Sequence, residues 1–158
     1  MPGIVIIDEA TEIGMVFEEL LQCVYDDKLV LKIAKLLTKR LTPEERAAVV
    51  SRTVEDGRCL LFVAVDQRRT LFVDFLLEEC HADTQQRDDH DMTPLAMAAS
   101  AGEPNTVMSL IRHGVNVNAV AYGMPILQCS IRRHEIDESI VRMLVENGAD
   151  VNPPADNG

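Results

Sequence analysis

The strongest constraint on this chain of 158 residues is a sequence pattern that returns with a period of about 33 residues. The short segments ADTQ, VNVN and ADVN end at Gln85, Asn118 and Asn152. Successive segments are therefore separated by about one period. The last two segments close the similar stretches LIRHGVNVN and LVENGADVN. A fixed period of this length indicates a stack of small repeats, because each unit can bury its apolar face only against its neighbours.

The residues between these segments predict two helices per repeat. Thr93 can cap a helix with its hydroxyl, and Pro94 suits the first helical position, where its missing N–H has no partner to lose. Gly102 and Gly114 can close the two helices in a left-handed conformation. This repeat therefore reads as a helix-turn-helix unit, and its signature residues are Thr93, Pro94, Leu95, Ala98, Ala99, Gly102, Leu110, Ile111 and Gly114.

This signature resembles the ankyrin repeat. The resemblance implies an all-α fold, a single ankyrin-repeat solenoid of about four helix-turn-helix repeats with short hairpin-like loops. The expected parts are an N-terminal cap at 1–19, a first repeat at 20–41, an inserted helix at 42–56, repeats at 57–87, 88–118 and 119–152, and a tail at 153–158. Cys23 and Cys129 take positions that hold a small alanine in the third repeat, so we expect both thiols to be buried.

The inserted helix has a start signal of its own. Thr42 is a suitable cap, Pro43 suits the first helical position, and Glu44 and Glu45 favour the first turn. We therefore expect a further helix between the first and second repeats.

Composition excludes several classes of function. A net charge of −11 argues against nucleic acid, which binds clustered lysine and arginine. Four cysteines without a Cys-x-x-Cys pair predict neither a zinc site nor a disulfide framework. Apolar runs are too short for a signal peptide or a membrane span, so we expect an intracellular protein, in the cytoplasm and also in the nucleus.

Catalytic motifs are missing from the sequence. It has no Gly-rich phosphate loop, no G-x-S-x-G and no H-E-x-x-H, so we expect no enzyme, no catalytic residue, no cofactor and no metal. An enzyme acting through Cys80 or Cys59 is the alternative, but Cys80 and His81 are neighbours in sequence and would point apart on a helix.

The ankyrin resemblance implies that a protein or peptide binds on the concave surface of loop tips and first helices. The chain would then be an adaptor, an inhibitor or a substrate-recognition subunit. We expect a monomer, and its acidic charge would favour a basic partner. The alternative is homo-oligomeric assembly through the ends of the stack. The expected contact residues are Arg58, Asp66, Gln67, Arg69, Asp89, His90, Met92, Ser100, Ala101, Glu103, Tyr122, Ile131 and Arg132.

Four of these residues, Arg58, Met92, Tyr122 and Arg132, are the preferred contacts, because arginine, methionine and tyrosine are enriched in protein interfaces. A narrower resemblance covers residues 20–85, with DDKLVLKIAKLL, TPEERAAVVSRTVEDG and LLFVAVDQRRTLFVDFLLEECHADTQ. These stretches are similar in layout to the opening of the Fem family. That resemblance implies a substrate receptor of cullin-RING ubiquitin ligases, and no functional residue is transferred from it.

Overall fold

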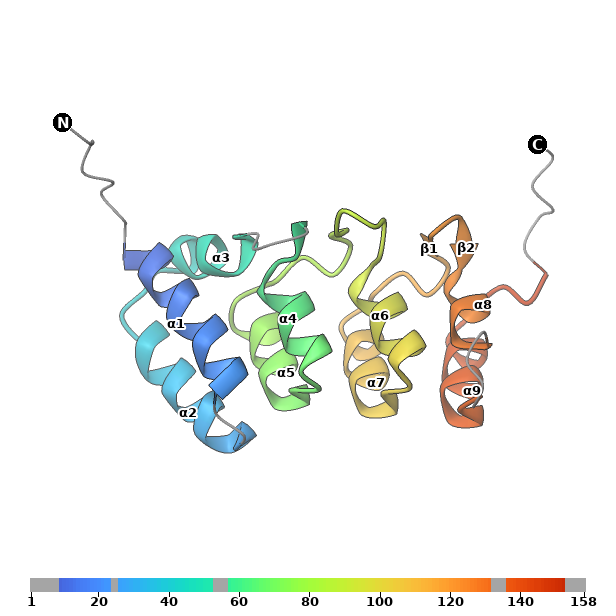
Figure 1. Cartoon of the computed structure of the whole chain (residues 1–158), viewed down its shortest axis with the longest axis horizontal. Helices are drawn as coiled ribbons and strands as arrows, with labels where there is room; N and C mark the ends of the chain where they lie inside the picture. The colour runs from blue at the N-terminus through green and yellow to red at the C-terminus, as the bar shows by residue number, and fades with distance from the viewer. Residues whose placement is uncertain (1–8, 24–25, 53–56, 132–135, 153–158) are drawn as a thin grey trace. The chain divides into compact units, whose positions relative to one another are not determined.

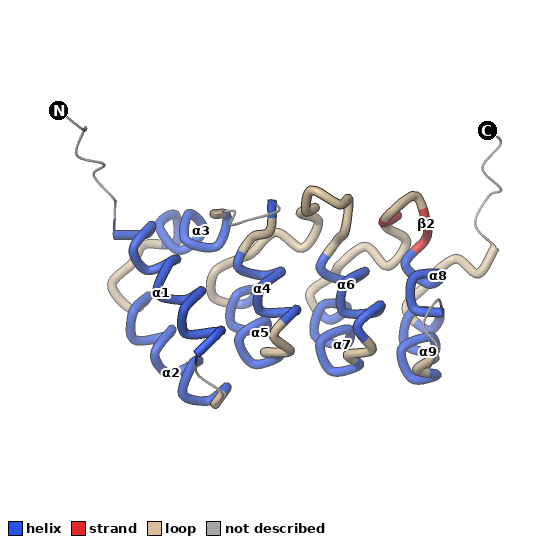
Figure 2. The backbone as a smooth tube through the Cα atoms, viewed as in Figure 1, coloured by secondary structure: helices blue, strands red, loops and turns tan. Residues whose placement is uncertain are grey.

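The computed structural model describes residues 9–23, 26–52, 57–131 and 136–152, which form two compact units joined between Ala82 and Asp83 (Figures 1 and 2). The first unit contains α1 (Glu9–Cys23), α2 (Asp27–Thr38), α3 (Pro43–Ser51), α4 (Leu60–Asp66) and α5 (Thr70–Glu78). The second contains α6 (Pro94–Ala101), α7 (Pro104–Arg112), β1 (Val120–Ala121), β2 (Met124–Pro125), α8 (Ile126–Ile131) and α9 (Glu138–Glu146).

The first unit is held together by apolar side chains of α1 and the helix pair α4–α5. α1 packs against α2, α3 and α4, and α2 packs against α5. Phe17 of α1 meets Phe72 of α5 edge-on, with ring centroids 5.5 Å apart. Both rings are fully buried, as are Leu21 and Leu61. Edge-to-face aromatic contacts add about 0.5–1.5 kcal/mol to the gain from burial, so this pair is a centre of the core.

The first repeat begins earlier than the sequence predicted. α1 starts at Glu9, so residues assigned to an N-terminal cap belong to the first helix. Ile13, Phe17 and Leu21 recur at every fourth position, lie on one face of α1 and are buried. The expected burial of Cys23 is wrong, because Cys23 lies about 200° around the helix from Leu21 and is exposed.

The helix predicted from the Thr42-Pro43 start signal is α3. Glu45 N donates to Thr42 Oγ1 at 3.3 Å, and Thr42 N donates to Glu45 Oε2 at 2.7 Å. These reciprocal bonds form a capping box, which satisfies two backbone donors that the helix itself leaves open. Arg52, which follows α3, donates to the carbonyl of Thr11 in α1 at 3.1 Å and so ties the inserted segment to the first repeat.

In the second unit, two helix pairs pack in parallel layers. α6 packs against α7 and α8, and α7 and α8 each pack against α9 (Figure 1). Thr93 Oγ1 accepts from Ala96 N at 3.2 Å, and Gly102 ends α6 with a φ of 72°. Leu95 and Ala98 are fully buried, so the small alanine allows the close approach of α6 to its neighbours.

The period of the sequence returns in the loops that follow the second helices. The side chains of Asp83, Asn116 and Asp150 each accept a hydrogen bond from the second backbone N–H after them, at 2.8–2.9 Å. These are Asx turns, in which a short side chain stands in for a backbone carbonyl. Three successive repeats therefore end with the same local hydrogen bond.

Within the described ranges, no helix is long and apolar enough to cross a bilayer.

Candidate protein-interaction surface

A tight turn at residues 88–92 projects from the start of the third repeat. Asp88 Oδ1 accepts from His90 N at 3.0 Å and from Met92 N at 2.9 Å. The backbone closes the same turn, since Asp88 N donates to Met92 O at 3.1 Å. Asp91 takes a left-handed φ of 62°, which aspartate tolerates better than most residues. The buried Asp88 carboxylate thus fixes the shape of the loop and leaves its tip exposed.

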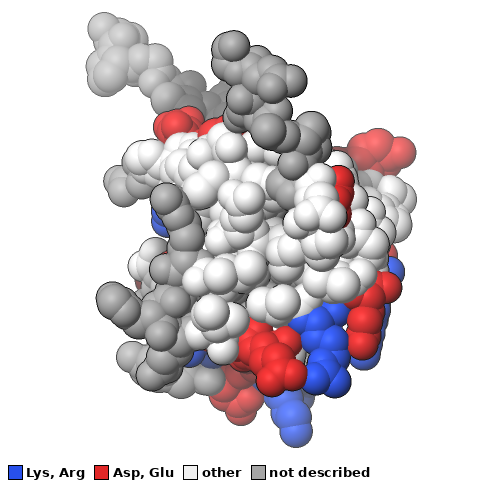
Figure 3. Space-filling view, turned by 90° about the vertical axis from the view of Figure 1, so that its right-hand side faces the viewer, with Lys and Arg blue, Asp and Glu red and all other residues white. Residues whose placement is uncertain are grey.

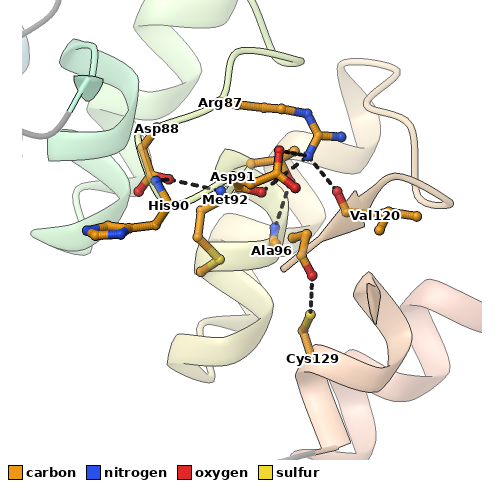
Figure 4. Close-up of polar contacts among 10 residues, drawn as sticks. Arg87, Asp88, His90, Asp91, Met92, Ala96, Val120 and Cys129 are labelled. Carbon is orange, nitrogen blue, oxygen red and sulfur yellow. Dashed lines mark hydrogen bonds and ion pairs between the residues drawn. The ribbon is translucent and has the colours of Figure 1, made fainter. Parts of the chain in front are cut away.

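Arg87 ties this turn to the next repeat (Figure 4). Its Nη1 lies 2.8 Å from Asp91 Oδ1 and 3.2 Å from Asp91 O, and it donates to Val120 O, in the following repeat, at 2.6 Å. All three contacts are made by Nη1, whose two hydrogens are shared between the two loops, so one side chain can hold the loops in register. The two successive loop tips of this unit are therefore linked by hydrogen bonds.

The loop of the fourth repeat is a β-hairpin. β1 pairs antiparallel with β2, with Ala121 opposite Met124. Tyr122 and Gly123 form its turn with φ values of 53° and 69°. Two positive φ values are the mark of a type I′ turn, whose twist matches the flanking strands. Cys129 Sγ of α8 lies 3.9 Å from Ala121 O and is buried beneath the hairpin, as the sequence predicted for this thiol (Figure 4).

We define the hairpin surface as Asp89, His90, Asp91 and Tyr122, the exposed tip residues of these two loops. Tyr122 is 53% exposed although its ring is large and apolar. Asp91 is occupied by Arg87, whereas the Asp89 and His90 side chains project from the turn. The surface thus combines an aromatic ring, an imidazole and carboxylates on a backbone fixed by hydrogen bonds.

The other expected contacts of the second unit lie at the carboxyl-terminal ends of α6 and α8. Ser100, Ala101 and Glu103 are half-buried, and Ser100 Oγ donates to Met97 O at 3.0 Å. Ile131 ends α8 and is 44% exposed. These residues lie at the opposite end of the helices from the hairpin surface. Arg132 lies outside the described residues.

Two expected contact residues face the interior. Met92 is only 9% exposed, because the Asp88 turn folds it back toward α6. Arg69 is 8% exposed and donates to Asp27 Oδ1 at 2.9 Å and to Leu21 O at 3.3 Å. The sequence predicted that both residues contact a partner, but their side chains are buried. Neither side chain can reach a partner without leaving its site, so both residues are removed from the expected surface.

The remaining expected contacts lie in the first unit. Asp66 and Gln67 are exposed at the end of α4, with their side chains 3.5 Å apart. Arg58 is half-buried before α4. Position along the repeat identified these residues, but only the structure distinguishes the exposed pair from Arg58 and from the buried Arg69.

Cys80 is a poor candidate for a nucleophile. It is 1% exposed, and burial raises the pKa of its thiol to about 11, with Arg46 opposing and Glu79 adding to the shift. The neighbouring His81 is exposed with a φ of 53°. A thiol with this pKa is protonated at neutral pH, whereas the thiolate is the reactive form. Among the described residues, no group of three His, Cys, Asp or Glu side chains could hold a metal ion.

Two residues that organise the loops were missed in the sequence. No feature of the sequence distinguishes Arg87 from the other charged loop residues, and its link to Val120 becomes visible only with the fold. Asn118 Nδ2 donates to Gly148 O at 2.9 Å, and its Oδ1 accepts from Asp150 N at 2.7 Å. Asparagine recurs at the repeat end in the sequence, and this recurrence could have indicated the hydrogen bonds of Asn118.

Paired helices, a period of about 33 residues and projecting loops define a helical-repeat protein of the kind that presents a surface to partners. The chain belongs to the ankyrin-repeat family: the family model "Ankyrin repeats (3 copies)" matches residues 61–155. It is also 30% identical over 104 residues to Delta-latroinsectotoxin-Lt1a of Latrodectus tredecimguttatus. That alignment covers 65% of this chain and 9% of the toxin. Neither match points to the Fem family.

Proposed function

We propose that this chain is a protein-interaction module that binds a protein or peptide partner through the hairpin surface. The observation that carries the proposal is the Arg87 tie between the two loops of the second unit. It fixes exposed loop tips, and a surface fixed before binding loses less conformational entropy when a partner arrives. Ankyrin repeats are in general modules for protein–protein interaction.

The chemistry of the hairpin surface favours a partner segment with a cation next to an apolar or aromatic group. Asp89 offers a carboxylate on an exposed turn, and Tyr122 offers a ring with a hydroxyl at its edge. Tyrosine is enriched at the centre of interfaces, because it buries a large area at little entropic cost. The net charge of −11 would speed the approach of a basic partner.

The role of adaptor, inhibitor or substrate-recognition subunit is a finer part of this proposal, as is a monomeric state in the cytoplasm or nucleus. Service as a substrate receptor of a cullin-RING ligase rests only on the resemblance of residues 20–85 to the Fem family. Arg58, Asp66 and Gln67 would add contacts from the first unit, and Ser100, Ala101, Glu103 and Ile131 would add them from the second.

Affinity capture with a matched pair of variants tests the proposal. The test variant carries Asp89→Ser, His90→Ala and Tyr122→Asn, the last of which gives the Asn-Gly sequence that type I′ turns prefer. The control variant carries Glu146→Ser and Asn105→Ala, which also remove one carboxylate from the second unit. We expect partners captured by the wild type and the control to be lost from the test variant. Identical partner lists for all three proteins would contradict the proposal.

A second candidate function is self-assembly through the end of the second unit. Figure 3 shows a broad area without charged side chains on the side of α8 and α9. Ile131 ends α8, Ile136 precedes α9 and Val145 lies in α9, and the three residues are 44%, 57% and 42% exposed. Large apolar side chains left exposed on one helix pair can mark an interaction site. Light scattering over a concentration series tests it: a mass that stays monomeric, unchanged by Val145→Glu, would exclude assembly through this face.

A further inference from the structure

The outer face of α2 carries a basic stripe in an otherwise acidic protein. Lys28, Lys32 and Lys35 lie within about 60° of one another around the helix, at about 100° per residue. Lys39 continues the same stripe beyond the helix end, and all four lysines are exposed. The chain has a net charge of −11, so a run of cations on one helix is a local inversion of the surface charge.

Three acidic groups around this stripe are already engaged. Asp27 accepts from Arg69, and the Asp26 carboxylate caps α2 by accepting from the backbone N–H groups of Lys28 and Leu29. Glu79, which directly follows α5, places its Oε1 2.8 Å from Lys35 Nζ. Among the described residues, the ammonium groups of Lys28 and Lys32 form no ion pair, so two of the cations are left to attract an anionic group.

Exposed leucines lie beside these lysines. Leu36 is 63% exposed and Leu29 is 46% exposed, which leaves two large apolar side chains in contact with water. A shallow hollow of about 360 Å³ runs along the stripe, and its walls are formed by Lys28, Leu31, Lys32, Lys35 and Leu36. A hollow of this size accepts a few apolar side chains, with lysines placed to meet carboxylates around them.

We propose that this α2 face, defined by Lys28, Leu31, Lys32, Lys35 and Leu36, docks an acidic amphipathic segment of a partner protein. The partner would place a large apolar side chain in the hollow and glutamate or aspartate side chains against Lys28 and Lys32. The hollow between leucines favours inserted side chains over a flat anionic membrane. This site belongs to the first unit and does not depend on the hairpin surface.

Fluorescence anisotropy with a labelled helical peptide tests the proposal on the full chain. The peptide carries leucine at every third or fourth position and glutamate on both sides, and its counterpart carries lysine in place of each glutamate. We expect the wild type to bind the acidic peptide and not the basic one. Raising the salt concentration from about 0.15 M to about 1 M should weaken this binding, because the Debye length falls from about 8 Å to about 3 Å.

Charge-reversal variants locate the binding. Lys28→Glu with Lys32→Glu should weaken binding about tenfold, since attraction becomes repulsion at two positions. Lys28 lies in the first turn of α2, where an acidic residue is favourable, and Lys32 is exposed, so this variant should fold, as circular dichroism can show. Leu36→Ser should weaken binding severalfold without changing charge. Arg112→Glu, a charge reversal on α7 in the second unit, should bind as the wild type does.

Three results would overturn the proposal. The first is equal binding by the wild type and the Lys28→Glu/Lys32→Glu variant. The second is binding of the basic peptide as tightly as the acidic one. The third is cosedimentation with phosphatidylcholine vesicles that contain phosphatidylserine, together with no binding of the acidic peptide, which would identify the face as a membrane contact instead.

Discussion

Arg69 Nη1 lies 2.9 Å from Oδ1 of Asp27, a residue 42 positions earlier in the chain. The side chain of Arg69 is 10% exposed and that of Asp27 is 29% exposed. The ion pair joins the start of α2 to the turn before α5, and the same guanidinium also donates to Leu21 O. One arginine therefore connects the first repeat to the second, where the sequence suggested a free surface residue.

Arg69→Ala should lower the free energy of unfolding by about 2–3 kcal/mol. Breaking a buried pair costs about 3–5 kcal/mol, and the partial exposure of Asp27 reduces that cost. Gln67→Ala, an exposed neighbour, should change stability by less than about 0.5 kcal/mol. Urea unfolding of both variants measures the difference. Equal midpoints would show that the Arg69 contacts do not stabilise the fold.

In three repeats, a residue just after the second helix takes the left-handed conformation. His81, Gly114 and Gly148 take equivalent positions after the second helices of three successive repeats, with φ values of 53°, 74° and 91°. Histidine pays a steric penalty there that glycine avoids. His81→Gly should raise the free energy of unfolding by about 0.5–1 kcal/mol, even after the entropic cost of glycine.

The matched change at the equivalent position is Gly114→Ala. No atom lies within 4 Å of a Cβ built on Gly114, so crowding is not involved and only the backbone conformation resists substitution. We expect a loss of about 1 kcal/mol in thermal or urea unfolding. A gain in stability would show that the repeats do not share this left-handed helix end.

Sequence patterns predicted the parts of the fold that depend on local chemistry. Thr93 and Thr42 cap the helices that their spacing indicated, because a hydroxyl before a proline acts within one turn of chain. The start of α1 was missed because it has no Thr-Pro signal and is instead defined by the burial of Phe17 against Phe72. The burial of Arg69 and Met92 was missed for a related reason: position in a repeat says nothing about contacts made through space.

Thiol reactivity follows from the burial of three of the four cysteines. Cys23 is exposed, whereas Cys59, Cys80 and Cys129 are buried. Alkylation with iodoacetamide at about pH 8 should label Cys23 rapidly in the folded protein and the other three only after unfolding. Mass spectrometry of peptides identifies the labelled sites. Rapid labelling of Cys80 in the folded protein would contradict its raised pKa.

The raised pKa of Cys80 should also lower the free energy of unfolding at alkaline pH. Its pKa is raised to about 11 in the folded protein, so folding favours the protonated thiol. The contribution is complete below the pKa of the unfolded thiol, about 8.5, and is lost as the pH rises through about 11. Unfolding measured from about pH 8 to about pH 11 should therefore show a smaller decline in Cys80→Ala than in the wild type. Parallel declines would assign the effect to other groups.

Loosening the Arg87 tie should affect the loops more than the helices. Arg87→Ala removes the donor to Val120 O and to Asp91, at a cost of about 1–2 kcal/mol for charge-assisted bonds on a part-exposed side chain. Hydrogen exchange at residues 88–92 and 120–125 should become faster, while exchange in α6 stays slow. Unchanged loop exchange would show that the tie does not order the hairpin surface.

Hydrogen exchange of the wild-type protein, alone and bound to a partner recovered by affinity capture, tests directly whether the hairpin surface is the binding site. Binding through the hairpin surface predicts new protection at residues 88–92 and 120–125, with α7 and α9 unchanged. Protection confined to α7 and α9, or none in the two loops, would contradict the central claim that these loop tips bind the partner.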